Sequence, residues 1–109
     1  MIIKFDDLEE RELLSFYGGK GALRSRMIVD ENNKILRGKL VPGATIGAHM
    51  HETSSEIIFI LTGLGKITCD GVVEYLKAGD CHYCPKGSGH AFENAGEEDV
   101  HFFAVVPNH

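Results

Sequence analysis

The pattern of hydrophobic and polar residues along the chain predicts many short β-strands. Apolar and polar residues alternate over short runs, and glycine, proline or asparagine separates one run from the next. The strands that we expect cover residues 22–30, 35–41, 56–61, 66–69, 72–76, 80–84, 90–94 and 99–106. Asp70-Gly71 is a strong hairpin signal, because both residues accept the left-handed backbone of a tight turn. Short strands at regular spacing predict an all-β sandwich or barrel.

The N-terminal part of the chain departs from this pattern. Residues 6–15 place leucines among charged side chains, which predicts a short N-terminal helix or turn. Residues 15–21 are rich in glycine and contain Lys20, but the spacing of a phosphate-binding loop is missing. We therefore interpret residues 15–21 as a loop that leads into the first long strand.

Length and charge limit the classes of function. A chain of 109 residues fits one domain, residues 1–109, with a core of its own. The net charge of −5 disfavours nucleic acid and anionic membrane surfaces as partners. No apolar run reaches the roughly 20 residues of a membrane span, and the acidic residues near the N-terminus are unlike a signal peptide. We therefore expect a cytoplasmic protein.

The three cysteines do not predict a disulfide framework, because their number is odd and no secretion signal is evident. Cys81 and Cys84 form a Cys-x-x-Cys pair, but a structural zinc site needs a second pair of ligands at similar spacing. A second metal site built from Cys81, His82, Cys84 and His90 is disfavoured too, because strand alternation points His82 away from Cys81. We therefore expect thiols that are packed within a strand.

Four residues form a candidate metal site. His49 and His51 are two positions apart, so in a strand both imidazoles point to one face, about 7 Å apart. Glu56 and His90 each open a later strand and can add a ligand from there. Three imidazoles and one carboxylate suit Mn²⁺, Fe²⁺, Ni²⁺, Zn²⁺ or Co²⁺ better than Ca²⁺ or Mg²⁺. The alternative is that the histidines are solvated loop residues and that Glu56 is unrelated to them.

The spacing of these residues resembles the two conserved motifs of the cupin superfamily. The first motif matches Gly43-x₅-His49-x-His51-x₄-Glu56-x₆-Gly63, and the second matches Gly79-x₅-Pro85-x-Gly87-x₂-His90-x₃-Asn94. The motifs span residues 43–63 and 79–94. The resemblance implies a jelly-roll β-barrel that holds one divalent transition metal ion (Mn, Fe, Ni, Zn or Co) on His49, His51, Glu56 and His90.

The resemblance also implies a class of function. Cupins with this ligand set include dioxygenases, oxidases, decarboxylases, lyases and sugar isomerases, so we favour a metal-dependent enzyme acting on a small organic molecule. Dioxygenase-type oxidation is the preferred reaction, and isomerase or lyase chemistry are the other enzymatic options. The alternative is a non-catalytic barrel that binds a small, sugar-like molecule through a receptor or structural metal. An assay for turnover distinguishes the two.

Alternation along the strands suggests what surrounds the metal. Counting from Glu56 and His90 places Ile58, Ile60 and Phe92 on the metal face. Tyr83 and His101 are the candidate catalytic residues for proton transfer. Barrel packing is the alternative for Tyr83, and a surface position at a strand end is the alternative for His101.

The remaining side chains bear on the substrate and on assembly. Leu36 and Leu40 alternate with the basic residues Arg37 and Lys39, so these cations are expected to face outward, and no anion clamp is evident. This favours a neutral or weakly polar ligand.

Met50 falls opposite the two histidines and is expected in the core. Ile57, Phe59 and Leu61 also face away from the ligands. They can pack on the other sheet or form the interface of a homodimer, the assembly that the resemblance implies.

Overall fold

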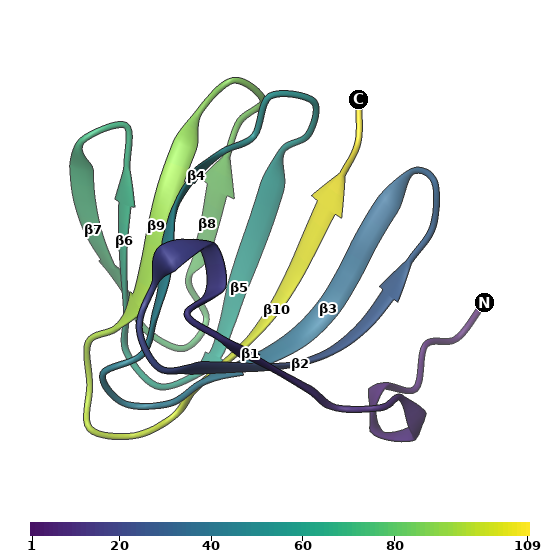
Figure 1. Cartoon of the computed structure of the whole chain (residues 1–109), viewed down its shortest axis with the longest axis horizontal. Helices are drawn as coiled ribbons and strands as arrows, with labels where there is room; N and C mark the ends of the chain where they lie inside the picture. The colour runs from purple at the N-terminus through teal and green to yellow at the C-terminus, as the bar shows by residue number, and fades with distance from the viewer.

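The computed structural model describes all 109 residues, most of which lie in β-strands (Figure 1). The strands are β1 (Arg11–Leu14), β2 (Ala22–Val29), β3 (Asn33–Leu40), β4 (Thr45–Met50), β5 (Glu56–Thr62), β6 (Gly65–Cys69), β7 (Val72–Leu76), β8 (Cys81–Cys84), β9 (Gly89–Asn94) and β10 (Val100–Pro107). Two short 3₁₀ turns, η1 (Phe5–Asp7) and η2 (Phe16–Gly18), precede β1 and β2. The prediction of an all-β chain is confirmed.

Two antiparallel sheets face each other. The larger has the strand order β1-β2-β3-β10-β5-β8, and the smaller has the order β4-β9-β6-β7. In Figure 1, β8, β5, β10 and β3 run side by side toward the right, and the smaller sheet lies to the left. The fold is the expected jelly roll, but the sheets do not close into a barrel, because their edge strands are not hydrogen-bonded to one another.

The core fills the space between the sheets. Leu36 and Leu40 of β3 alternate inward, as expected, and so do Ile58 and Ile60 of β5. Phe102 of β10 meets Phe92 of β9 edge to face, with the ring centroids 5.2 Å apart. This aromatic pair joins the two sheets at the centre of the molecule.

The N-terminal segment differs in part from the prediction. The expected short turn is present as η1, but residues 11–14 form strand β1 and not a helix. β1 pairs with β2, and Leu13 lies opposite Leu23. In so short a segment with few apolar residues, the sequence pattern does not distinguish the 3.6-residue period of a helix from the two-residue period of a strand. Pairing with the free edge of β2 therefore decides its conformation.

No helix in the structure has the length and apolar character needed to cross a bilayer.

The outer faces of the sheets carry the second difference. Met50 was expected in the core, but its side chain is 60 % exposed. The prediction was wrong because no further layer covers the outer face of the smaller sheet. Ile57, Phe59 and Leu61 lie on the outer face of β5 and remain about 40 % exposed in the single chain.

A buried asparagine fastens the two sheets at one end of the core. Asn94, at the end of β9, donates hydrogen bonds to the carbonyl oxygens of Leu40 (2.8 Å) and Glu98 (2.7 Å). Its own side-chain oxygen accepts from the Gly96 amide at 2.9 Å. Asn94 therefore caps the turn that follows β9.

We predict that Asn94→Ala lowers the free energy of unfolding by about 2–3 kcal/mol, because it leaves the buried Leu40 carbonyl without a partner. Urea denaturation followed by circular dichroism measures the change. Asn32→Ala is the matched control: the side chain is exposed, and its loss should cost less than about 0.5 kcal/mol. Equal effects of the two substitutions would contradict this role of Asn94.

Candidate metal centre

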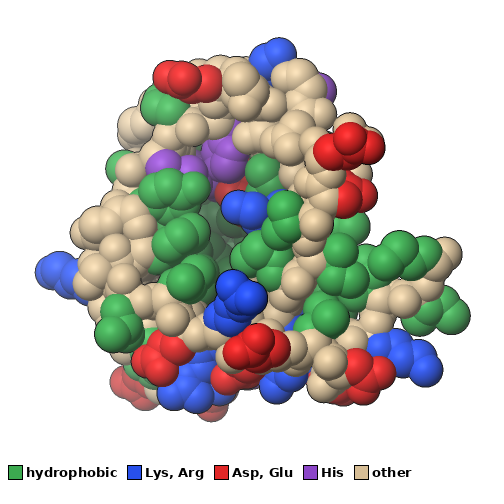
Figure 2. Space-filling model, turned by 45° about the vertical axis from the view of Figure 1, so that its right-hand side comes forward, with side chains coloured by type: hydrophobic (Ala, Val, Ile, Leu, Met, Phe, Trp, Pro, Cys, Tyr) green, Lys and Arg blue, Asp and Glu red, His purple; other side chains and the backbone are tan.

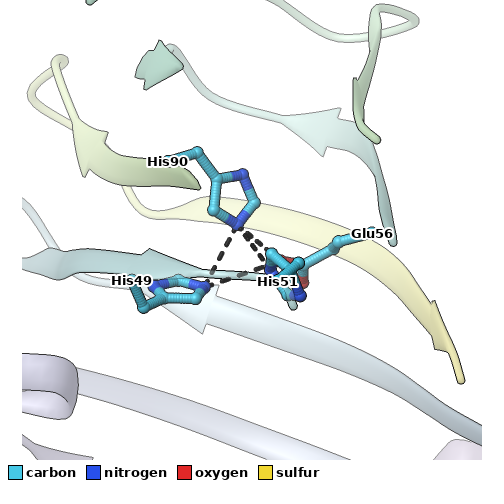
Figure 3. A group of neighbouring side chains, drawn as sticks. All are labelled: His49, His51, Glu56 and His90. Atoms are coloured by element: carbon cyan, nitrogen blue, oxygen red, sulfur yellow. Dashed lines mark hydrogen bonds and ion pairs between the residues drawn. The ribbon is translucent and has the colours of Figure 1, made fainter. Parts of the chain in front are cut away.

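The four predicted ligand residues come together between the sheets (Figure 3). Nε2 of His90 lies 3.1 Å from Nε2 of His49 and 3.1 Å from Nε2 of His51. Oε1 of Glu56 lies 2.8 Å from Nε2 of His90 and 3.2 Å from Nε2 of His51. All four ligand atoms lie within 4.8 Å of one another. Such a cluster can hold one metal ion.

Strand pairing explains why these residues meet. His49 of β4 lies directly opposite His90 of β9 in the smaller sheet. Glu56 opens β5 in the larger sheet and reaches the cluster from across the core. A bulge between Ile46 and His49 shifts the register of β4, a feature that often re-aims side chains near functional sites.

The loop of the second motif fixes His51, which lies just after β4. Its backbone amide donates to the Ser88 carbonyl at 3.0 Å, and its carbonyl accepts from the Gly87 amide at 2.7 Å. Gly87 has a φ of +90°, a backbone conformation that residues with a Cβ rarely adopt. The two sequence motifs are therefore connected through the backbone beside the site.

The hydrogen bonds on the outer side of each ring fit a bound metal ion. Nδ1 of His49 donates to the Gly47 carbonyl at 2.8 Å, because a carbonyl only accepts. Nδ1 of His51 lies 2.9 Å from the Ser54 hydroxyl, and Nδ1 of His90 lies 3.0 Å from Nε2 of His82. The Gly47 carbonyl holds the His49 ring in the tautomer whose Nε2 lone pair faces the cluster, and the partners of His51 and His90 permit the same tautomer there. The donor set therefore fits a divalent transition metal.

Electrostatics favour the charged carboxylate. Burial of Glu56 opposes ionisation, but the hydrogen bonds from His49, His51 and His90 outweigh it and hold the pKa of Glu56 well below its usual range. Burial also opposes protonation of His49, yet the Glu56 carboxylate and the Gly47 carbonyl together raise the pKa of His49 above 6.5. Protons therefore bind the His49 nitrogen more readily than that of an ordinary histidine.

The cluster lies at one end of a cavity of about 430 Å³ that opens to solvent. Figure 2 shows this hollow, with histidine near its upper end, hydrophobic side chains along its walls and basic side chains at its mouth. Ile58 and Phe92 line it as expected, whereas Ile60 is fully buried behind it. A small ligand can therefore reach the cluster through a largely apolar passage.

Two charged residues of the cavity were missed by the sequence analysis. Lys34 lines the cavity, and its charge acts on His49. Residue 34 was assigned to a turn, but β3 begins at Asn33, so Lys34 shares the inner face with Leu36 and Leu40. This cation was not placed at the cavity by the sequence analysis, which found no evident anion clamp. Glu52 also lines the cavity and is its only carboxylate besides Glu56.

An aromatic side chain from the N-terminal segment also covers the site. Tyr17 of η2 stacks on the His49 ring with the centroids 4.1 Å apart and the planes 13° apart. A Cβ on Gly47 would overlap the Tyr17 carbonyl, so glycine at this position permits η2 to pack on β4. The glycine-rich stretch is therefore a wall of the site and not only a connecting loop.

The two predicted catalytic residues lie elsewhere. Tyr83 is 58 % exposed on β8, and His101 is exposed on β10. Neither lines the cavity or contacts the four clustered residues. Both side chains point outward because they alternate with inward neighbours, such as His82 beside Tyr83.

The Cys-x-x-Cys pair is divided between the two faces of β8. Cys81 is exposed, whereas Cys84 is fully buried and the structure contains no disulfide. Burial and the neighbouring Cys69 thiol raise the pKa of Cys84 to about 12. The expected packed thiol is thus confirmed for Cys84 but not for Cys81.

Comparison with known proteins places this geometry in a family. The cupin domain family matches residues 36–106. An oxalate-binding protein from Thermotoga maritima is 32 % identical over 97 % of this chain and 93 % of its own length. The crystal structure of a predicted oxalate decarboxylase from Thermotoga maritima has a TM-score of 0.93 and 30 % identity, and each chain is covered completely.

A more distant structure supports the fold alone. A sugar phosphate isomerase of the cupin superfamily from Silicibacter pomeroyi has a TM-score of 0.82 and 20 % identity, with 100 % of this chain and 76 % of that chain covered. The match to the cupin domain, the jelly-roll topology and the converging histidines and glutamate agree with one another. The chain belongs to the cupin family.

Proposed function

We propose that the protein binds a divalent transition metal ion on His49, His51, Glu56 and His90, and through it a small dicarboxylate of the oxalate type. The observation that carries the proposal is the convergence of three Nε2 atoms and one carboxylate at the end of an open cavity. The oxalate-binding protein of Thermotoga maritima, which matches nearly the whole chain, supports the choice of ligand. When bound, the ion supplies Lewis-acid charge for carboxylate oxygens.

The charges of the cavity favour an anionic ligand. Neutral histidines and the Glu56 carboxylate around a divalent ion leave one positive charge, Lys34 adds a second, and the Glu52 carboxylate removes one. The charge around the site therefore stays positive, and it attracts a dicarboxylate. The apolar walls formed by Ile58, Phe92 and Phe102 lower the local dielectric constant, which strengthens this attraction. The site therefore suits an anion better than the neutral ligand suggested by the sequence.

We predict that oxalate binding requires the metal ion and that Lys34→Ala weakens it about tenfold, the effect of losing one partly exposed charged partner. Isothermal titration calorimetry of metal-loaded and chelator-treated protein measures both effects. Lys39→Ala is the matched control, because Lys39 lies on the same strand but outside the cavity. Oxalate binding to metal-free protein, or equal losses in both variants, would contradict the proposal.

Metal affinity should fall as the pH falls. The ion needs the unprotonated Nε2 of His49, and the raised pKa of His49 makes protons stronger competitors for this nitrogen than for that of an ordinary histidine. Below that pKa the dissociation constant should rise about tenfold per pH unit for one competing proton. Electron paramagnetic resonance of added Mn²⁺ between about pH 8 and pH 6 measures the dissociation constant. An affinity that stays constant over this range would show that His49 is not a ligand.

Turnover of the bound molecule is the second candidate function, with dioxygenase-type oxidation as the expectation from the sequence. Glu52 favours it, because this exposed carboxylate lines the cavity without belonging to the cluster and can hold or release a proton. Oxygen consumption and formate release from oxalate are the readouts. For an enzyme, Glu52→Gln should lower turnover by about 100-fold without weakening oxalate binding. Absence of both activities in iron-loaded and manganese-loaded protein would leave a binding protein.

We also propose that two copies of the chain pair through the outer face of β5. Ile57, Phe59 and Leu61 form a row of partly exposed apolar side chains there. Light scattering after size exclusion should show a dimer for the native chain and a monomer for Phe59→Glu. Val73→Glu, on the exposed strand β7, should leave the dimer intact. A monomeric native chain would refute this pairing.

The cytoplasmic location expected from the sequence stays a prediction.

A further inference from the structure

A second group of ligand-type side chains lies beside the candidate metal centre and shares none of its four residues. One ligand atom each from Cys69, His82 and Cys84 lies within 4.8 Å of the other two. His82 and Cys84 are buried, and Cys69 is partly exposed. Three donors therefore converge at one point in the interior, and Cys69 gives that point access to solvent.

The group joins the two sheets. His82 and Cys84 are two positions apart on β8 of the larger sheet, so both point to its inner face. Cys69 is the last residue of β6 in the smaller sheet, where it lies opposite His90 of β9. β6 and β8 are not hydrogen-bonded to each other. The three side chains therefore meet between two strands that no backbone hydrogen bonds connect.

No covalent bond occupies the donor atoms. The Cys84 sulfur has a long contact, 4.0 Å, with the Pro85 carbonyl and interacts with the neighbouring Cys69 thiol, but no disulfide is present. Nε2 of His82 is engaged by Nδ1 of His90 at 3.0 Å, so Nδ1 is the ring nitrogen of His82 left for a ligand. When Nδ1 of His90 donates to Nε2 of His82, the remaining proton of His82 lies on its Nδ1, and zinc binding there releases that proton. None of the three side chains lines the cavity in which oxalate is proposed to bind, although His82 contacts the ring of His90.

Two thiolates and one imidazole are a donor set typical of zinc, which is bound tetrahedrally with Zn–S distances of about 2.3 Å and Zn–N distances of about 2.0–2.1 Å. Donor atoms of such a site lie a little under about 4 Å apart, so this group needs only a small contraction. We propose that Cys69, His82 and Cys84 bind a second metal ion, zinc, which is separate from the ion of the histidine cluster and links the two sheets. Water completes the tetrahedron.

The ligand chemistry separates the two sites. The histidine cluster offers nitrogen and oxygen only, whereas this group offers two sulfurs. A His49→Ala/His51→Ala variant removes the first site and leaves the second intact. Cys81 supplies an internal control, because it is an exposed thiol on the opposite face of the same strand.

The test adds Co²⁺, a spectroscopic substitute for zinc, to the reduced and chelator-stripped His49→Ala/His51→Ala variant. We expect one Co²⁺ per chain with thiolate-to-cobalt charge-transfer absorption in the near ultraviolet, which added Zn²⁺ removes. A further Cys69→Ser/Cys84→Ser change should abolish the absorption, and Cys81→Ser should leave it unchanged. No absorption, or absorption that depends on Cys81 alone, would overturn the proposal.

A second measurement avoids the cysteine variants in case they fail to fold. X-ray absorption at the zinc edge of the zinc-loaded His49→Ala/His51→Ala variant should show two sulfurs per ion at about 2.3 Å. Zinc should also raise the melting temperature of this variant, because an ion bound only by the folded state stabilises it. A zinc shell made of nitrogen and oxygen alone would overturn the proposal. That result would leave the oxalate-binding proposal untouched, since it concerns the other site.

Discussion

The convergence of three imidazole nitrogens on the Glu56 carboxylate is the constraint on which the rest of the structure depends. Each Nε2 atom points into the cluster because the opposite nitrogen of the same ring is held by a hydrogen bond outside it. His49 and His90 come from the smaller sheet, and Glu56 comes from the larger one. Both sheets must therefore keep a fixed spacing and register for the cluster to exist.

The parts of the fold around the cluster serve this requirement. The bulge in β4 and the left-handed Gly87 position the two ends of the first motif against the second. Tyr17 covers His49 from the N-terminal side. The jelly roll remains open at its edges, so the cavity leads from solvent to the cluster between the sheets. This arrangement gives a buried ion access to a small ligand, with Lys34 supplying charge complementary to an anion.

The sequence predicted many of the inward-facing positions, because the alternation of residues along a strand is a local pattern. Residues two apart on a strand share a face, so the pairing of His49 with His51 and the inward positions of Ile58 and Phe92 followed from alternation. The ligand role expected of Glu56 came from motif spacing, because no local pattern places a residue of one sheet against the other. In the structure these residues lie together, as the resemblance to cupins implied.

The features that were missed depend on tertiary packing or on one residue at an element boundary. Lys34 enters the cavity because β3 starts two residues earlier than predicted, and alternation then turns this side chain inward. Met50 is exposed because nothing covers the outer face of its sheet, which a single strand cannot reveal. Cys69 meets Cys84 only because two strands from different sheets face each other.

The most direct test of the central claim is elemental analysis of the protein purified without chelator or affinity nickel, compared with the His49→Ala/His51→Ala variant. The account predicts about one Mn, Fe, Ni, Zn or Co ion per native chain that is lost in the variant, whereas zinc that remains in the variant belongs to the second site. A native protein that contains none of these ions and takes up none from added salts would contradict it, because the converging histidines would then have another role.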